Sequence, residues 1–173
     1  MSTYHHGDLR QAVLQTAGQV LEKEGLAALS LREVARRAGV SHNAPYRHFP
    51  DRESLLGALA AEGFEMLGNA LQSRPRREMW EAYVGFALAH PERFRLMFGG
   101  LVKLDKRDRR AYEGLLGSFA ELGDDAQYAA AAAWGLVHGL SQLLLDGHFE
   151  GRERDQFVRA VLSTVRFSAP RKA

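Results

Sequence analysis

Hydrophobic residues recur at three- and four-residue steps along most of this 173-residue chain, which is the spacing of amphipathic helices. In the first segment, for example, Leu9, Val13 and Val20 fall on one stripe. Runs in which β-branched residues alternate with polar ones are nearly absent. The pattern therefore predicts an all-α protein of about nine helices, over residues 8–24, 31–38, 42–49, 51–73, 77–89, 91–98, 105–122, 125–145 and 152–167.

Two of the predicted helices are only about two turns long and follow one another closely. Ser30 and Glu33 have the spacing of a capping box, which starts the first of them. Gly39 then permits the positive φ of a tight turn, and Pro50 ends the second, because the residue before a proline is pushed out of the helical region. Two short helices joined through a glycine turn, and covered by a longer helix, are typical of a helix-turn-helix motif.

Pro45 leaves the start of the second short helix open. If Ser41 is the N-cap, Pro45 is the fourth helical residue, and one backbone hydrogen bond is lost. If Asn43 is the N-cap, Pro45 lies in the first turn, where proline is well tolerated. In either register the segment carries small, hydrogen-bonding and cationic side chains, which suit the base edges in the major groove of DNA.

Charge permits a nucleic-acid partner without identifying its surface. The net charge is +2, from 23 Lys and Arg against 21 Asp and Glu, and the pI is about 9.1. Residues 32–52 hold five arginines against two acidic residues, a local +3, although Arg36 and Arg37 are interpreted as solvated surface. Residues 103–110 also carry +3, with the alternating signs of a solvated helix face. Capping and spacing, rather than basicity, indicate the segment that faces DNA.

The sequence LSLREVARRAGVSHNAPYRHFPDRESLL, residues 29–56, resembles the DNA-binding domain of the TetR family of transcriptional regulators. Besides the capped helix start, the matching features are the AGVS turn at 38–41, the YRHF segment at 46–49 and the RESL helix start at 52–55. The resemblance extends over roughly residues 8–56, and residue types, spacing and punctuation agree together.

A second, weaker resemblance concerns the C-terminal half of the chain. AAWGLVHGL at 132–140 is similar to the Trp-His-Gly (WHG) C-terminal domain found in a subset of the TetR family. The family fold is all-helical, usually with nine helices, and dimeric. The resemblance therefore implies a DNA-binding domain over 1–50 and a helical ligand-binding and dimerisation domain over 51–173.

The resemblance also implies roles for single residues. By position it implies phosphate contacts from Ser30, Tyr46, His48 and Arg52. It implies contacts to bases or to the nearby DNA backbone from Arg32, Ser41, His42, Asn43, Ala44 and Arg47. Pro45 stands where the family usually has an aliphatic residue, and the short chain implies a small or altered ligand cavity.

The C-terminal helices carry two groups of mainly apolar residues. The first fits either the lining of a pocket for an apolar effector or an ordinary core: Trp80, Tyr83, Phe86, Phe94, Met97, Phe98, Trp134 and His138. Trp134 and His138 lie four residues apart, and so on one helix face, toward a ligand, the core or a dimer interface. The second group predicts a four-helix dimer interface with two helices from each protomer. It consists of Val137, Leu140, Leu144, Phe157, Val158, Val161, Leu162 and Val165.

Several classes of protein are excluded by what the sequence lacks. With no cysteine, the chain has no disulfide scaffold, cysteine-ligated metal or thiol nucleophile. No window approaches the ~18 uninterrupted apolar residues of a membrane span, and the N-terminus lacks the apolar core of a secretory signal, so we expect a cytoplasmic protein without a membrane partner. Phosphate-loop and dinucleotide patterns are missing, and His5 and His6 are adjacent, which suits one metal site poorly, so no cofactor or metal is expected.

These observations predict a dimeric, ligand-responsive transcriptional regulator: a repressor that binds a near-palindromic DNA operator and is released by a small apolar effector. One alternative is a protein-interaction or ligand-sequestering helical dimer without DNA binding, for which Pro45 is the main argument. Another is a small hydrolase around His138, Ser141 and Asp146. No strand-turn-helix elbow surrounds Ser141, so we expect no catalytic residue and no enzyme activity.

Overall fold

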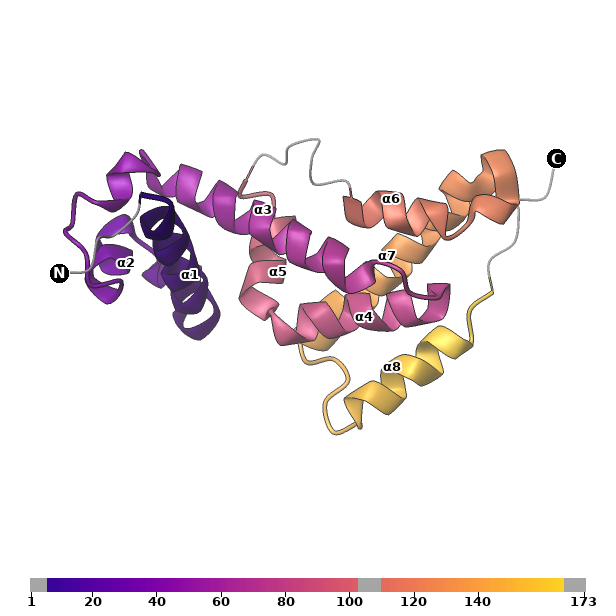
Figure 1. Cartoon of the computed structure of the whole chain (residues 1–173). Coiled ribbons are helices and arrows are strands. Elements are labelled where there is room, and N and C mark those ends of the chain that lie inside the picture. Colours follow the sequence, from indigo (N-terminus) through magenta and orange to yellow (C-terminus); the bar gives the residue numbers. More distant parts are fainter. Residues whose placement is uncertain (1–5, 103–109, 167–173) are drawn as a thin grey trace. The chain divides into compact units, whose positions relative to one another are not determined.

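The computed structural model describes residues 6–102 and 110–166. Every regular element in these ranges is a helix, which confirms the all-α prediction (Figure 1). The eight α-helices of the described ranges are α1 (His6–Glu24), α2 (Leu31–Arg37), α3 (Arg52–Leu71), α4 (Arg76–Ala89), α5 (Pro91–Phe98), α6 (Arg110–Gly117), α7 (Ala126–Leu145) and α8 (Arg154–Ser163). Between them lie the 3-10 segments η1 (Leu26–Ala28), η2 (Pro45–Arg47) and η4 (Ala120–Asp125).

The start and stop signals in the sequence account for several helix ends. Ser30 Oγ accepts a hydrogen bond from the N–H of Glu33 at 3.2 Å, which caps the start of α2 as predicted. Gly25 follows α1 with a φ of 78°, and Gly39 follows α2 with a φ of 67°. Gly123, with a φ of 57°, interrupts the helical structure of η4 between α6 and α7. Glycine is needed at such positions because a side chain strains a backbone with positive φ.

The prediction of a helix over 42–49 is wrong, because the segment is a turn followed by the single 3-10 turn η2. Pro45 has no N–H to donate to the Ser41 carbonyl, which instead accepts the N–H of Ala44 at 2.9 Å. Ala44 is the N-cap residue of η2, so the cap is neither of the two residues considered from sequence. One α-type hydrogen bond follows, from the N–H of Phe49 to the Pro45 carbonyl at 2.9 Å.

The predicted helix over 105–122 is only partly described. Its described part, α6, ends at Gly117, and η4 follows. Residues 103–109, which hold most of the second basic segment, lie outside the described residues, as does His5.

The first of two compact units consists of residues 1–63 together with 90–105. Within this unit, α1 contacts α2, η1, η2 and α5. Its most buried side chains include Val13, Leu21, Leu29, Leu55, Leu59 and Phe94. The short helices around the turn are therefore covered by α1, and α5 joins them from a later part of the sequence.

The second unit consists of residues 64–89 together with 106–173. Here α7 contacts α4, α6 and η4, and α8 packs on α4 (Figure 1). Phe119 is fully buried and stacks on Trp80, with ring centroids 6.4 Å apart. Residues 120–145 are long and apolar enough for a membrane span by length and composition alone, which is weak evidence because the core helix of a soluble protein passes the same test.

Candidate nucleic-acid interface

Residues 41–48, here called the recognition strip, turn their polar side chains outward. Pro45 is buried, and Phe49 just beyond the strip is only 2% exposed. The exposed members are Ser41, His42, Asn43, Tyr46 and Arg47, and the half-buried ones are Ala44 and His48. The apolar residues thus anchor the strip in the core of the first unit, and they leave hydrogen-bonding groups accessible to a partner.

The guanidinium groups of two arginines on α2 form ion pairs with carboxylates. Arg36 Nε donates to Glu33 Oε2 at 2.9 Å, and Arg37 Nη2 donates to Glu24 Oε2 at 2.8 Å. Hydrogen bonds from Arg36 and then from Arg37 lower the pKa of the Glu33 carboxyl to about 2. These two positive charges are therefore largely offset, and Arg37 ties α2 to the end of α1.

Two of the expected phosphate contacts also hold the fold together. Arg52 donates from Nε to the Leu29 carbonyl at 2.8 Å and from Nη2 to the Leu26 carbonyl at 2.7 Å. A guanidinium has five N–H donors, so Arg52 keeps three for a phosphate. Ser30 Oγ accepts the N–H of Glu33, which leaves the hydroxyl hydrogen to donate.

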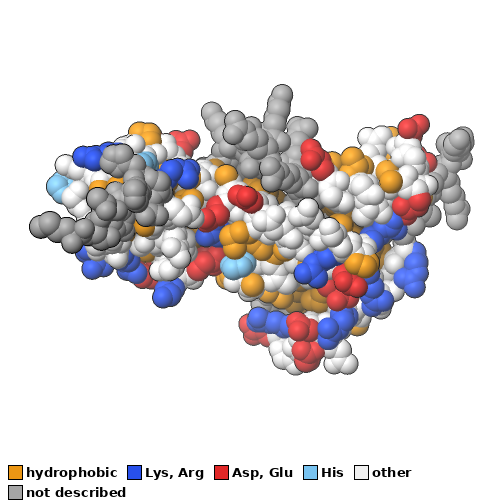
Figure 2. All heavy atoms as spheres, viewed as in Figure 1, with side chains coloured by type: hydrophobic (Ala, Val, Ile, Leu, Met, Phe, Trp, Pro, Cys, Tyr) orange, Lys and Arg blue, Asp and Glu red, His pale blue; other side chains and the backbone are white. Residues whose placement is uncertain are grey.

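Arg32 and Arg47 are exposed, and neither makes an ion pair within residues 6–102 and 110–166. A third cation comes from α1, where the Arg10 guanidinium lies 5.3 Å from the centroid of the Phe49 ring. Sequence reasoning missed Arg10, because its partner is distant in sequence and local spacing carries no signal for the contact. Figure 2 shows basic side chains (Lys or Arg) and histidine side chains at the surface around α1 and α2.

In the second unit, three side chains of the expected pocket form a chain of hydrogen bonds. Trp134 Nε1 donates to Tyr83 Oη at 3.1 Å, and Tyr83 Oη lies 3.0 Å from His138 Nδ1. The phenol oxygen of Tyr83 therefore accepts from the indole and shares a second hydrogen bond with the imidazole ring. Burial lowers the pKa of His138 and raises the pKa of Tyr83, so both groups are neutral near pH 7.

The other residues expected to line the pocket are divided between the two units. Trp80 and Phe86 are buried in the second unit, with Tyr83. Phe94 and Met97 are buried in the first unit, where Phe98 is half-buried and its ring is tilted against that of Phe94, with centroids 4.8 Å apart. Within the second unit, the structure thus brings together Tyr83, Trp134 and His138 of that set.

Ser141 takes no part in a nucleophilic arrangement. Its hydroxyl is fully buried and donates to the Val137 carbonyl, one turn earlier in α7, at 2.7 Å. His138 Nδ1 is bonded to Tyr83 instead. The hydrolase alternative has no geometric support here.

The residues expected at a dimer interface are mostly covered by the protomer itself. Val137, Leu140, Leu144, Val158 and Leu162 are buried, and Phe157, Val161 and Val165 are half-buried. The reason is that α7 and α8 both pack against α4. The large apolar side chains that α7 leaves exposed are instead Tyr128, Trp134 and Leu143.

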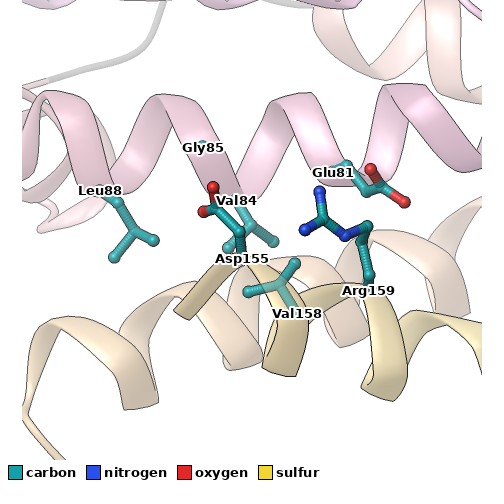
Figure 3. Close-up of a pocket in the computed structure, with 7 residues that line it drawn as sticks. All are labelled: Glu81, Val84, Gly85, Leu88, Asp155, Val158 and Arg159. Atoms are coloured by element: carbon teal, nitrogen blue, oxygen red, sulfur yellow. The ribbon is translucent and has the colours of Figure 1, made fainter. Parts of the chain in front are cut away.

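A pocket of about 200 Å³ lies between α4 and α8 (Figure 3). Val84, Leu88 and Val158 give it an apolar floor, and the charged groups at its border are on Glu81, Asp155 and Arg159. None of the eight residues expected to line an effector pocket lines it.

The fold and the exposed strip define a helix-turn-helix protein, and comparison with known families gives its class. Residues 13–59 match the model for bacterial regulatory proteins of the tetR family, and residues 76–165 match the tetracyclin repressor-like C-terminal domain. The second match alone covers more than half of the chain. The chain belongs to the TetR family of transcriptional regulators, which are DNA-binding proteins and not enzymes. The narrower resemblance to the WHG subset stays a prediction.

Curated relatives match mainly in the DNA-binding region. The HTH-type transcriptional repressor Rv3405c of Mycobacterium tuberculosis is 36% identical over 52 residues, 30% of this chain and 28% of the relative. The tetracycline repressor protein class C of Escherichia coli is 36% identical over 76 residues, 43% of this chain and 34% of the relative. The match thus spans about a third or less of these relatives.

Solved structures extend the likeness to nearly the whole chain. A protein of unknown function from Rhodococcus sp. RHA1 is 36% identical, covers 95% of this chain and 96% of its own, and has a TM-score of 0.81. A TetR variant from Acinetobacter baumannii AYE, solved in complex with minocycline, is 18% identical, covers 94% of both chains and has a TM-score of 0.65. The second likeness shows the fold alone.

Proposed function

We propose that this regulator is a homodimeric repressor that binds a near-palindromic operator through the recognition strip. The observation that carries the proposal is how the first unit uses its charges. Arg36 and Arg37 are held by carboxylates, whereas Arg32 and Arg47 are exposed, as are most of the hydrogen-bonding groups of the strip. A surface with accessible cations and base-reading groups, on a small motif fixed by a core, suits the major groove.

The contacts divide into two kinds. Ser30, Tyr46, His48 and Arg52 are proposed to bind phosphates, with Arg52 also bonded to carbonyls of the first unit. The residues proposed to reach bases or adjacent backbone are Arg32, Ser41, His42, Asn43, Ala44 and Arg47. Because η2 is a single 3-10 turn, base contacts come from the turn before it as well as from η2 itself.

A dimer is proposed through α7 and α8. Tyr128 and Leu143 of α7 are 60% and 41% exposed, and Phe157 and Val161 of α8 are half-buried. Such apolar area is typical of a helix pair that is completed by the same pair from a second protomer. A dimer would present two strips roughly 34–36 Å apart, or somewhat more, in successive major grooves.

We propose a small, apolar effector for the second unit, and the cytoplasm as the place of action. The relative from Acinetobacter baumannii was solved with minocycline, and its fold is shared by this chain. The hydrogen-bonded Tyr83, Trp134 and His138 offer aromatic faces with a few fixed polar atoms, which is the usual make-up of a small-molecule site. An effector acts only through different affinities for the DNA-binding and released states.

Selection of duplexes from a random pool, followed by gel shifts at fixed, near-physiological salt, tests DNA binding. We expect enrichment of a site with two half-sites and a Kd within about 10⁻⁸–10⁻¹¹ M. Retardation without sequence selectivity at that salt would overturn the proposal.

One observation favours a second candidate, a ligand-sequestering or protein-interaction dimer. Pro45 reduces the recognition segment from an α-helix to one 3-10 turn. Tight, sequence-selective binding to a palindrome would remove this candidate.

A further inference from the structure

The most unusual charge in the first unit is Arg93 of α5, whose side chain is almost completely buried. Its Nη1 donates to the Leu59 carbonyl at 3.1 Å and to Glu62 Oε2 at 2.8 Å, both on α3. From α1, Glu22 Oε1 accepts the backbone N–H of Arg93 at 3.1 Å, and Oε2 accepts that of Glu92 at 3.3 Å. A carboxylate of α1 thus caps the start of α5, while a guanidinium of α5 reaches α3. We call this cluster the α5 clasp.

Two glycines make room for the clasp. A Cβ at Gly18 of α1 would lie 2.5 Å from Arg93 Nη2. A Cβ at Gly63 of α3 would lie 3.1 Å from Arg93 Cγ and 2.6 Å from Met97 Sδ. The three helices therefore approach one another closely at the point where the buried charge lies.

Stability alone does not explain a buried guanidinium at this position. Removing such a charge from water is costly, and a well-packed apolar side chain usually serves the core as well or better. The Arg93 Nε also lacks a hydrogen-bond partner among the described residues. The charge does, however, constrain the packing of two helices. Its hydrogen bonds are satisfied only at one relative placement of α3 and α5.

The position of α5 in the chain makes this geometric constraint relevant to the recognition strip. The chain passes from the first unit to the second inside α3, after Gly63, and returns just before α5, at His90. The clasp lies at both passages, because Glu62 precedes the first and Arg93 follows the second. It therefore fixes the points at which α3 leaves and α5 enters the unit that carries the recognition strip.

We propose that Glu22, Glu62 and Arg93 are positioning residues for DNA binding, which set the orientation of the recognition strip in each protomer and thereby the half-site spacing that the dimer accepts. This inference rests on the proposed binding of a two-half-site operator. It assigns the clasp no contact with DNA. Loosening the clasp widens the range of spacings, while each strip still reads its own half-site.

The test uses the full-length protein and a duplex that the wild type selects from a random pool. Derivatives of this duplex carry one base pair more or one fewer between the half-sites, and a further duplex carries one half-site. A one-base-pair change moves a half-site by about 3.4 Å and turns it by roughly 35°, so we expect the wild type to bind the altered duplexes at least about tenfold more weakly.

The variants are Arg93→Met and Glu22→Gln, with Arg95→Met as the matched control. Arg95 is on the same helix but exposed, and its guanidinium pairs with Glu92 of α5 itself. For both clasp variants we expect the spacing preference to fall to about threefold or less, with affinity for the single half-site within about twofold of wild type. Arg95→Met should keep the wild-type preference. Circular dichroism checks folding, and if Arg93→Met is unfolded, Glu22→Gln decides alone.

Amide hydrogen exchange gives an independent measurement of the same link. The N–H groups of Glu92 and Arg93 should exchange faster in Glu22→Gln than in wild type, while the amides of α2 stay unchanged. Retention of the full spacing preference by a folded clasp variant overturns the inference and leaves the proposed function intact. Failure of the wild type to select any two-half-site duplex overturns both.

Discussion

The two units of the chain differ in the polar contacts at their proposed sites, although Arg76 of the second unit also bonds to a carbonyl and to a carboxylate. In the first unit, arginines bond to carboxylates and carbonyls: Arg37 to Glu24 on a neighbouring helix, and Arg52 to two carbonyls at η1. In the second unit, the chain from Trp134 through Tyr83 to His138 is neutral. The positive charge available to a DNA partner thus depends on which arginines already have partners, and not on their number.

The burial of polar groups explains the difference. Neutral groups are buried at modest cost once they are hydrogen-bonded, whereas a charge needs a partner or water. In the first unit, most guanidiniums lie at the surface, and Arg93 is the exception that is buried with a carboxylate. Substitutions in the two units should therefore differ in kind: packing and DNA binding in the first, and pH dependence in the second.

The largest expected effect is on the packing of the first unit. Gly63→Ala should lower the free energy of unfolding by about 1–3 kcal/mol, because the added Cβ overlaps Met97 Sδ and crowds Arg93 Cγ. Gly57→Ala, on the same helix with open space around its Cβ, should raise it by roughly 0.5–1 kcal/mol. Urea denaturation of both variants measures the difference, and equal shifts would show that α5 does not pack closely at Gly63.

A base-reading role for His42 predicts a local loss of specificity. His42→Ala should relax the preference at one base position by about 1–3 kcal/mol and leave the others unchanged. Arg36→Ala removes a guanidinium held by Glu33 and should leave the preference profile as it is. Competition binding with single-base variants of the selected duplex measures both profiles. A uniform loss of affinity in His42→Ala would contradict the assignment.

Substitutions at Arg52 and Arg47 should distinguish an arginine that both binds DNA and stabilises the fold from an arginine that only binds DNA. Arg52→Ala should weaken binding to all sequences, lower the salt slope by roughly one, and cost about 1 kcal/mol of unfolding free energy, because two carbonyls lose their donor. Arg47→Ala should affect DNA binding without changing stability, since its exposed side chain makes no ion pair in the described parts of the chain. Salt titrations measure DNA binding by each variant, and thermal unfolding measures the stability of each. A loss of stability in Arg47→Ala would count against this division of roles between the two arginines.

The smallest expected effect is on stability at acidic pH, and it involves His138 of the second unit. Because burial lowers the pKa of His138 in the folded protein, the unfolded chain takes up a proton first as the pH falls below about 6.5. The contribution of this group to stability should therefore fall as the pH drops from 7.5 to 5. His138→Asn should reduce the drop in stability. Denaturation at both pH values compares this variant with the wild type, and an unchanged drop in His138→Asn would contradict the assignment.

Local signals predicted the fold well where they acted alone. Ser30 with Glu33 marked the start of α2, and Gly39 marked its turn, because capping and positive φ depend on a few adjacent residues. The prediction of a helix around Pro45 is wrong, because proline has no N–H to donate. The Ser41 carbonyl accepts the N–H of Ala44 instead. That choice depends on the packing of Pro45 in the core as well as on sequence.

Pairings between distant residues were beyond the sequence pattern. Arg37 with Glu24, and Arg52 with the carbonyls at η1, join residues that no helical repeat relates. The same holds for Glu22 with Arg93, which brings α5 into the first unit. Likewise, the apolar faces of α7 and α8 predicted burial correctly but did not distinguish a cover within the protomer from a partner.

The central claim, that the recognition strip reads DNA, is tested most directly by the affinity ratio between a selected duplex and a scrambled one. The ratio should be measured by competition at one near-physiological salt concentration. We expect a ratio of about 10³ or more for the wild-type protein. A ratio near one, from a folded protein, would contradict it.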